Sequence, residues 1–214
     1  MLELKDIRIN YNSSNLDRVE LCPFEQFESW LEDAFDTDEI IEPNAMTLCT
    51  IDSCTEDSKS KPSARIVLLR GFSESGFEFY TNYNSRKGKE IASNNNAALC
   101  FYWDKLERQV RIEGKVSKLS ESKSDEYFNS RPRGSKISAI ISEQSQEIAS
   151  KENLENKFNE LELNKEELER PKHWGGYILS PNKIEFWQGR PNRLHDRFVY
   201  ILNEDQWKIK RLNP

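Results

Sequence analysis

Apolar residues along this chain recur mostly at strand spacing, in short runs that polar turns separate. Tight turns are predicted at 73–76, 180–182 and 203–205, and an exposed loop over 52–62. We predict strands over 45–51, 64–69, 77–81, 97–103, 109–119, 175–179, 183–188, 197–202 and 206–210. Helices are inserted between groups of strands instead of alternating with them one by one. This order favours a mainly β (α+β) fold, an antiparallel barrel with helical decorations, over a doubly wound sheet.

Helical spacing is clearest near the start of the chain. A helix is predicted over 23–35, with Pro23 in its first turn and large apolar residues on one face. Further helices are predicted over 86–94 with Ser85 as the cap, 122–130, 135–142, and from about 151 with Leu154, Phe158 and Leu161 inward. Residues 1–20 are polar and are expected to form an arm that is ordered only by contact with something else. The remaining residues, 21–214, then form one domain with a helical insertion at about 121–170.

Composition narrows the class of protein. Eleven Phe, seven Tyr and five Trp supply the bulk for a core, although charged residues make up 32% of the 214 residues. A net charge of −6 argues against a nucleic-acid binder, whose footprint is a basic excess. Four cysteines without a Cys-x-x-Cys pair and two histidines assemble no zinc pattern. No apolar run approaches a membrane span. We therefore expect a soluble, cytoplasmic protein without a metal site.

The segment 186–198 concentrates the most chemistry, because it holds three arginines and His195 between aromatic runs. Strand alternation would send Arg193, His195 and Arg197 to one face and Leu194 to the other. That face would be a planar cationic wall suited to an anionic heterocyclic ligand. The alternative is a strand edge protected by charged residues, and the pattern leaves the two interpretations evenly balanced.

Other candidates suggest anion binding without a glycine-rich phosphate loop. Arg65 and Arg70 stand at the ends of one apolar strand, and Arg86 and Lys87 occupy a helix start, where basic residues are unusual. Tyr127, Arg131 and Ser135 surround a bend expected at Pro132 and offer a second phosphate clamp, while Gln109, Gln144 and Ser145 could bind the edge of a heterocycle. Strand ends that reach solvent and a solvated helix junction remain alternatives for these positions.

Several separated motifs carry a resemblance that spans nearly the whole chain. They are Arg65–Leu69, Phe79–Asn82, Ser85–Lys87, Leu106–Val110, Tyr127–Arg133, Phe186–Gly189, Arg193–Arg197 and Trp207–Ile209. With these motifs the chain resembles the pyridox(am)ine 5′-phosphate oxidase family of flavoenzymes. The resemblance implies an FMN-binding split β-barrel of antiparallel, Greek-key type. It also implies a cytoplasmic homodimer with FMN bound between the subunits.

The resemblance further implies an activity. Such an enzyme would oxidise pyridoxamine or pyridoxine 5′-phosphate to pyridoxal 5′-phosphate, the last step of vitamin B6 cofactor synthesis. A hydride equivalent would pass from C4′ of the substrate to N5 of FMN. Oxygen would then be reduced to hydrogen peroxide, with ammonia as a further product from the amine. No nucleic-acid or membrane partner is expected.

Site residues are carried over position by position. FMN would be held by Arg65, Ile66, Val67, Leu68, Leu69, Arg70, Tyr80, Thr81, Arg86, Lys87, Gln109, Gln144, Ser145, Trp187 and Arg197. The substrate would be bound by Arg8, Tyr11, Arg70, Tyr127, Arg131, Ser135, Arg193 and His195, the last two as catalytic residues that hold C4′ over the flavin.

One departure concerns position 70, where the family usually has Lys and this chain has Arg70. A guanidinium can pair with phosphate through two hydrogen bonds, but it is longer and planar, so the pocket is reshaped. Two alternative functions stay open. One is a split-barrel flavoprotein with another substrate, and the other is a non-catalytic protein that binds FMN or pyridoxal phosphate.

Overall fold

A computed structural model describes residues 10–13, 15–53, 60–164 and 166–214, so the predicted site residue Arg8 lies outside the described residues. Strands account for 38% of the described residues. The helices are α1 (Pro23–Phe35), α2 (Arg86–Ser93), α3 (Glu121–Ser130), α4 (Arg133–Ile141) and α5 (Lys151–Leu163), with short 3-10 turns at Asp104–Leu106 and Pro191–Arg193. The strands are β1 (Ala45–Asp52), β2 (Lys61–Leu68), β3 (Gly71–Ser73), β4 (Gly76–Asn82), β5 (Asn96–Trp103), β6 (Arg108–Lys118), β7 (Trp174–Gln188), β8 (Asp196–Asn203) and β9 (Gln206–Arg211).

The chain divides into two compact units. Unit 1 comprises residues 1–48, 98–114 and 181–214, and unit 2 comprises 49–97 and 115–180. Hydrogen bonding orders the strands β2-β1-β5-β6-β7-β4-β3, and β8 pairs with β7 and β9. The pairings β3–β4, β4–β7, β7–β8 and β8–β9 are antiparallel, which agrees with the predicted mainly β class.

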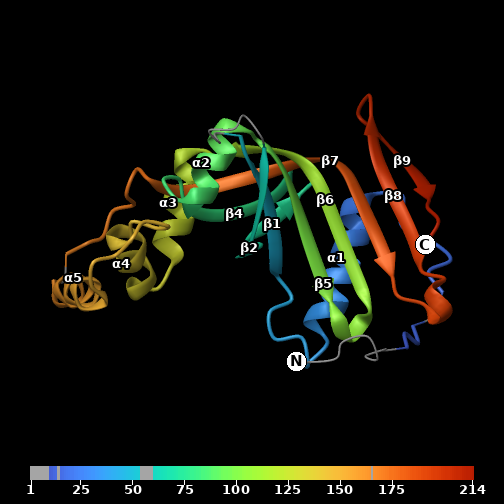
Figure 1. Cartoon of the computed structure of the whole chain (residues 1–214), viewed down its shortest axis with the longest axis horizontal. Coiled ribbons are helices and arrows are strands. Elements are labelled where there is room, and N and C mark those ends of the chain that lie inside the picture. Colours follow the sequence, from blue (N-terminus) through green and yellow to red (C-terminus); the bar gives the residue numbers. More distant parts are fainter. Residues whose placement is uncertain (1–9, 14, 54–59, 165) are drawn as a thin grey trace. The chain divides into compact units, whose positions relative to one another are not determined.

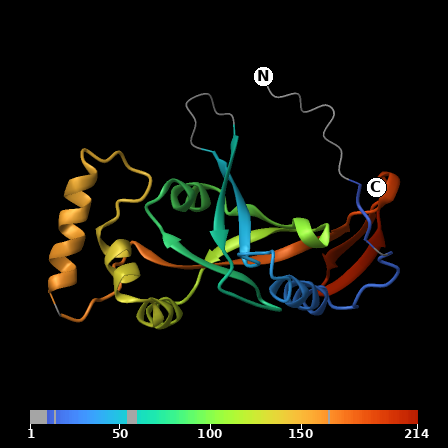
Figure 2. The ribbon, with the colours of Figure 1, turned by 90° about the horizontal axis from the view of Figure 1, so that it is seen from below.

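Unit 2 places its helices beside a buried antiparallel ladder. Phe77 and Phe79 of β4 are fully buried, and they pair with Leu179 and Tyr177 of β7. A second apolar cluster, formed by Phe128, Ala139 and Trp174, joins α3 and α4 to the start of β7. Helices α4 and α5 lie side by side (Figures 1 and 2), and Phe158 of α5 is half-buried. The inward stripe predicted for α5 is therefore present.

Unit 1 buries one face of α1 against aromatic strand residues. The Trp30 ring meets Phe186 edge-on at 5.2 Å, and Phe27 lies 5.1 Å from Phe101. In the β8–β9 hairpin, both turn residues, Glu204 and Asp205, have positive φ, as a tight two-residue hairpin turn requires. The helix predicted over 23–35 is confirmed by α1.

Two local predictions are wrong. The turn expected at 180–182 is absent, because β7 continues through these residues. Ser180 and Asn182 are exposed and Pro181 is buried, so the period-two alternation of a strand persists and overrides the turn-forming residue types. The short strand β3 was also missed, since three residues carry too little periodicity to detect.

Candidate functional site

A cavity of about 1010 Å³ opens in unit 2 and collects most of the predicted FMN and phosphate residues. Strands β2 and β4, helices α2 to α5 and the segment after α4 contribute to its wall. The predicted residues among its lining are Arg65, Ile66, Val67, Leu68, Arg70, Tyr80, Thr81, Lys87, Tyr127, Arg131, Ser135 and Gln144. The structure thus brings together residues from four separate motifs.

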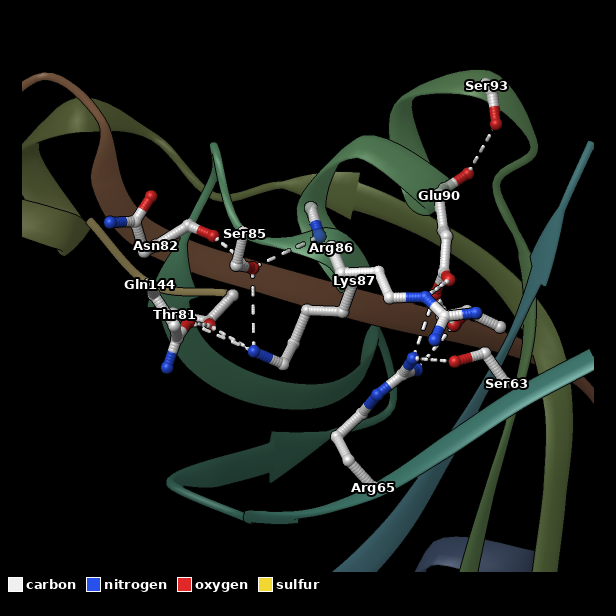
Figure 3. Close-up of polar contacts among 12 residues, drawn as sticks. Ser63, Arg65, Thr81, Asn82, Ser85, Arg86, Lys87, Glu90, Ser93 and Gln144 are labelled. Carbon is white, nitrogen blue, oxygen red and sulfur yellow. Dashed lines mark hydrogen bonds and ion pairs between the residues drawn. The ribbon is translucent and has the colours of Figure 1, made fainter. Parts of the chain in front are cut away.

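Lys87 stands at the start of α2, where Ser85 caps the helix by accepting a hydrogen bond from the Gly88 backbone. The Lys87 ammonium is buried and donates to Gln144 Oε1 at 3.0 Å and to Thr81 Oγ1 at 3.3 Å (Figure 3). Burial and the charge of Arg65 lower the pKa of Lys87 from its ordinary value of 10.5, while Glu90 opposes this shift. Among the described residues, the hydrogen-bond acceptors of this buried cation are all neutral, which leaves its charge available to an anion.

Arg65 belongs to a closed network of charges. Its guanidinium donates to Glu90 Oε2 at 2.8 Å, to Ser63 Oγ at 2.6 Å and to Thr50 Oγ1 (Figure 3). Glu90 lies within α2, is 4% exposed and also accepts from Arg86 Nε at 2.8 Å. Burial alone would raise the pKa of Glu90, but the hydrogen bonds from Thr50, Arg65 and Arg86 outweigh burial and lower it. One buried carboxylate therefore holds two predicted FMN residues in place.

Three aromatic rings form a stack at the other side of the cavity. Tyr80 and Tyr127 stack with centroids 3.9 Å apart, and Trp174 stacks with them at 5.9 and 6.2 Å. The Arg131 guanidinium lies 4.5 Å above the Trp174 centroid. Burial raises the pKa of Tyr80 to about 12, with smaller contributions from Glu78 and Tyr127, so the phenol keeps its proton at neutral pH. The stack therefore supports Arg131 through a cation–π contact with Trp174.

The described residues leave one hydrogen-bond donor of Arg131 without an acceptor. Its Nη1 atom is buried and has no hydrogen-bond partner, and within the described residues Arg131 forms no ion pair. Burial lowers the pKa of Arg131, and the charge of Arg70 lowers it further, against an opposing effect of Tyr127. A bend at Pro132 separates α3 from α4, as predicted, and Ser135 lies in the first turn after it. Arg131 itself is half-buried, and its buried Nη1 without a partner indicates a place for an oxyanion.

Six of the predicted FMN residues do not line this cavity, and Trp187 and Arg197 of unit 1 are two of them. Leu69 is 5% exposed and packs in the core, and Gln109 lies on β6 in unit 1. Arg86 and Ser145 line a second cavity of 370 Å³ in unit 2, together with Glu90. Ser145 has a φ of 72°, a left-handed conformation that reverses the chain directly after Gln144.

The remaining predicted residues cluster in unit 1. His195 lies 4.7 Å from the Trp187 ring, and Tyr11 meets both rings edge-on at 5.7 Å. Arg197 pairs in register with Trp187 across β7 and β8, and its Nε donates to Glu185 Oε1 at 2.9 Å. Glu185 is 2% exposed, so this arginine is fixed by a buried carboxylate.

The alternation predicted for 193–197 is wrong. Pro191–Arg193 forms a 3-10 turn, with Asn192 and Arg193 at φ values of 58° and 62°, and β8 begins only at Asp196. Proline and two left-handed residues prevent the extended conformation that alternation requires. The common face predicted for Arg193, His195 and Arg197 therefore has no strand to produce it.

The His195 ring is held by Arg190, a residue for which the sequence predicts no role. The Arg190 backbone N–H donates to His195 Nδ1 at 3.0 Å. Burial lowers the pKa of His195, and the Arg193 charge lowers it further, so the neutral imidazole is favoured. Sequence reasoning missed Arg190, Glu90 and Glu185. The spacing of Arg86 and Glu90 by four in α2 is a local signal that could have indicated Glu90. The contacts of Glu90 with Arg65 and of Glu185 with Arg197 form only in the folded chain.

The described residues contain neither a cluster of metal-ligating side chains nor a membrane-spanning helix. No cluster of three or more His, Cys, Asp or Glu side chains is arranged to hold a metal ion among them. Within the same residues, no helix has the length and apolar character to cross a membrane.

Comparisons with known proteins agree on one family. Residues 32–165 match the family model described as pyridoxamine 5′-phosphate oxidase, and 174–214 match the pyridoxine 5′-phosphate oxidase C-terminal dimerisation region. Proteins named pyridoxine/pyridoxamine 5′-phosphate oxidase from Cyanothece sp. and Paraburkholderia phytofirmans are 51% and 50% identical. Each comparison covers 100% of this chain, and 99% and 100% of the relatives.

Solved structures support the fold. PhzG from Burkholderia lata, in complex with tetrahydrophenazine-1-carboxylic acid, is 31% identical, with a TM-score of 0.84 over 91% of this chain and 94% of that one. A pyridoxamine 5′-phosphate oxidase-related, FMN-binding protein from Nostoc punctiforme has a TM-score of 0.72 at 17% identity, over 91% and 98% of the two chains, and shares the fold. The split-barrel class and FMN as the cofactor of the family are thereby confirmed. The chain belongs to the pyridoxamine 5′-phosphate oxidase family.

Proposed function

We propose that this protein is an FMN-dependent oxidase that converts pyridoxamine and pyridoxine 5′-phosphates to pyridoxal 5′-phosphate. Molecular oxygen is the electron acceptor and hydrogen peroxide the product, with ammonia released from the amine and water consumed. The observation that carries the proposal is the unit 2 cavity, which has two separate cationic regions. Lys87 with Arg65 forms one, and Arg131 with Arg70 forms the other.

The cavity residues fit FMN. The cavity volume of about 1010 Å³ reaches the upper end of the range of roughly 300–1,000 Å³ typical of small-molecule sites. Lys87 offers charge to a phosphate, and Arg65 is held at the cavity wall by Glu90. Thr81 and Gln144 offer a hydroxyl and an amide to polar ring edges. When bound, FMN supplies the two-electron acceptor that no amino-acid side chain provides. The protein supplies binding and orientation.

The orphaned Nη1 of Arg131 is the predicted contact for the substrate's 5′-phosphate. Tyr127 and Ser135 line the same cavity and can add hydroxyl donors, and Arg70 adds a second charge. A phosphate dianion between two guanidiniums would remove their mutual repulsion and satisfy the unpartnered donor. The substrate phosphate therefore suits this region better than an uncharged group.

The unit 1 cluster supplies the other predicted roles. We assign Trp187 and Arg197 to FMN, and Arg193 and His195 to the substrate ring, with Tyr11 covering it. His195, kept neutral, acts as a hydrogen-bond donor and not as an acid. The dimerisation region at 174–214 contains these residues except Tyr11, and we propose a homodimer with FMN at the interface.

One observation favours a second function. PhzG, at 31% identity, is seen with tetrahydrophenazine-1-carboxylic acid, so a tricyclic carboxylic acid of that kind is the alternative substrate. Arg131 can pair with a carboxylate as well as with a phosphate. The 50–51% identity to proteins named pyridoxine/pyridoxamine 5′-phosphate oxidase supports the phosphate ester.

Anaerobic mixing of the purified, FMN-loaded protein with pyridoxamine 5′-phosphate tests the proposal. Bleaching of the flavin absorbance, followed by peroxide formation when air is admitted, is the expected result. The same mixing with tetrahydrophenazine-1-carboxylic acid tests the alternative. An unchanged flavin spectrum with both pyridoxamine and pyridoxine phosphates would contradict the proposal, and an unchanged spectrum with all three compounds would indicate a carrier.

A further inference from the structure

The described part of the N-terminal segment is bound to the rest of unit 1. Glu107 accepts hydrogen bonds from the backbone N–H of Asn12 at 3.0 Å, from that of Ser13 at 3.0 Å, and from Ser13 Oγ at 2.7 Å. Gly189 N–H donates to the Glu107 backbone carbonyl at 2.7 Å. The turn that carries Glu107 therefore touches both the N-terminal segment and the segment leading to His195.

Arg190 makes the second connection between these two segments. Its Nη1 donates to the Ser13 carbonyl at 2.6 Å, and its Nε lies 3.5 Å from Asp196 Oδ2. The same Asp196 oxygen accepts from the Leu16 backbone N–H at 3.1 Å. The guanidinium is therefore held between the N-terminal segment and the first residue of β8.

The Arg190 backbone decides how the His195 ring can act. An Nδ1 that accepts a hydrogen bond carries no proton, so the neutral ring must carry its proton on Nε2. Protonation at Nδ1 would replace this hydrogen bond with a clash of two donors. Among the described residues, the other groups that face the ring are the Tyr11 phenol side chain, Trp187 and the Arg193 charge, and none of these is an anion.

We propose that Arg190 is a positioning residue for the substrate. Its backbone N–H fixes the Nε2–H tautomer of His195, and its guanidinium holds residues 11–13 so that Tyr11 packs on the same imidazole. The consequence rests on the proposed function: the Nε2–H donor and the Tyr11 ring meet the substrate in one fixed arrangement. Arg190 stabilises substrate binding without touching the reacting atoms.

The first test reads the tautomer in the FMN-loaded protein. The chain has only two histidines, so a His173→Gln variant assigns the His195 signals in a long-range proton–nitrogen spectrum. We expect Nδ1 to resonate as the unprotonated nitrogen across neutral pH. A protonated Nδ1 in the parent protein overturns the proposal, whatever the substrate proves to be.

The second test compares Arg190→Ala with Arg211→Ala. Arg211 pairs with the same Asp196 carboxylate but has no hydrogen bond to His195 or to the described part of the N-terminal segment, so it is the matched control. In Arg190→Ala we expect the Asn12 and Ser13 amides to exchange hydrogen about tenfold faster, because one charge-assisted hydrogen bond is lost. The KM for pyridoxamine 5′-phosphate should rise about three- to tenfold, with kcat within about twofold of the parent.

Arg190→Lys keeps one donor for Ser13, so its amide exchange rates and its KM should lie between those of the parent and of Arg190→Ala. This variant keeps the test available if Arg190→Ala does not fold. Equal changes in the Arg190 and Arg211 variants would contradict the proposal, since a general loss of stability would then explain both. The tautomer and exchange measurements need no turnover. A protein that fails to oxidise pyridoxamine phosphate but shows both signatures would overturn the proposed function and leave the structural role of Arg190 standing.

Discussion

Two arginine clusters line the same cavity of unit 2, and they differ in whether the fold supplies partners for their charges and hydrogen-bond donors. Arg65 donates to Glu90, Ser63 and Thr50, so its charge and donors are satisfied within the fold. Arg131 lies over the Trp174 ring with a buried Nη1 that has no partner among the described residues, near the like charge of Arg70. The Arg65 cluster is therefore neutralised by Glu90 before any ligand binds, whereas the Arg131 cluster is not.

The difference indicates which cluster waits for a ligand. An unpartnered buried guanidinium destabilises the protein alone, by about 1–3 kcal/mol for each unmade hydrogen bond and more for a charge. An anion that binds there recovers this free energy, because binding to the folded state alone stabilises it. At the Arg65 cluster, Glu90 removes the penalty, so that cluster can be rigid before any ligand arrives.

Replacing the buried carboxylate should have the largest effect. Glu90→Gln leaves the Arg65 and Arg86 guanidiniums without their counter-charge, and we expect the free energy of unfolding to fall by about 3 kcal/mol. Chemical denaturation of Glu90→Gln against the exposed control Glu74→Gln measures this difference. Because the pKa of Glu90 in the folded protein is lowered below 4.5, its contribution is present above about pH 4.5 and is lost as the pH falls through the folded pKa. Equal stability of the two variants would show that the cluster is not held by Glu90.

Replacing Arg131, the cation with an unpartnered donor, should weaken substrate binding without lowering the stability of the fold. Arg131→Met keeps the contact with Trp174 but deletes the charge, and we expect the KM for pyridoxamine 5′-phosphate to rise about 30- to 100-fold. The apoprotein should be at least as stable as the parent, because a buried unpaired charge is gone. Steady-state kinetics and thermal unfolding check both parts. A KM within twofold of the parent would remove Arg131 from the substrate site.

The pH dependence of cofactor binding should distinguish Lys87 from the arginines. The pKa of Lys87 is lowered from 10.5, mainly by burial, and only its protonated form attracts a phosphate. FMN affinity should therefore fall, by about tenfold, as the pH rises through the lowered pKa, still below 10.5. Flavin fluorescence titration from pH 7 to 10 measures it. Lys87→Met should bind FMN more weakly and without this pH dependence; retention of the full dependence in the variant would assign it to another group.

The smallest effect is expected at position 70. Arg70 is exposed, so replacing it with Lys keeps a charge at the cavity but removes the planar fork. We expect Arg70→Lys to change the KM for pyridoxamine 5′-phosphate by about threefold, with FMN content unchanged. Arg70→Met, which removes the charge, gives the upper limit. A larger effect for Lys than for Met would show that geometry outweighs charge here.

The sequence by itself determined features that local chemistry controls. The apolar spacing of α1, the Ser85 cap of α2 and the break at Pro132 all depend on neighbours within a few residues, and each is present. The spacing of the basic motifs was also sufficient to predict anion binding. Arg65, Lys87 and Arg131 line one cavity as the resemblance implied, although their roles toward FMN and substrate remain predictions.

Only the tertiary structure decided the rest. The continuity of β7 through Pro181 depends on its burial pattern, and the turn at 191–193 depends on two left-handed residues, which residue types alone do not dictate. The partners of the key cations lie far away in sequence: Glu90 meets Arg65 from 25 positions on, and Arg190 meets Ser13 across 177. Such contacts leave no periodic signal, because the chain brings them together only when the core has packed. The sequence shows which groups are charged, whereas the tertiary structure determines which of them are paired within the protein and which keep a donor that a ligand could satisfy.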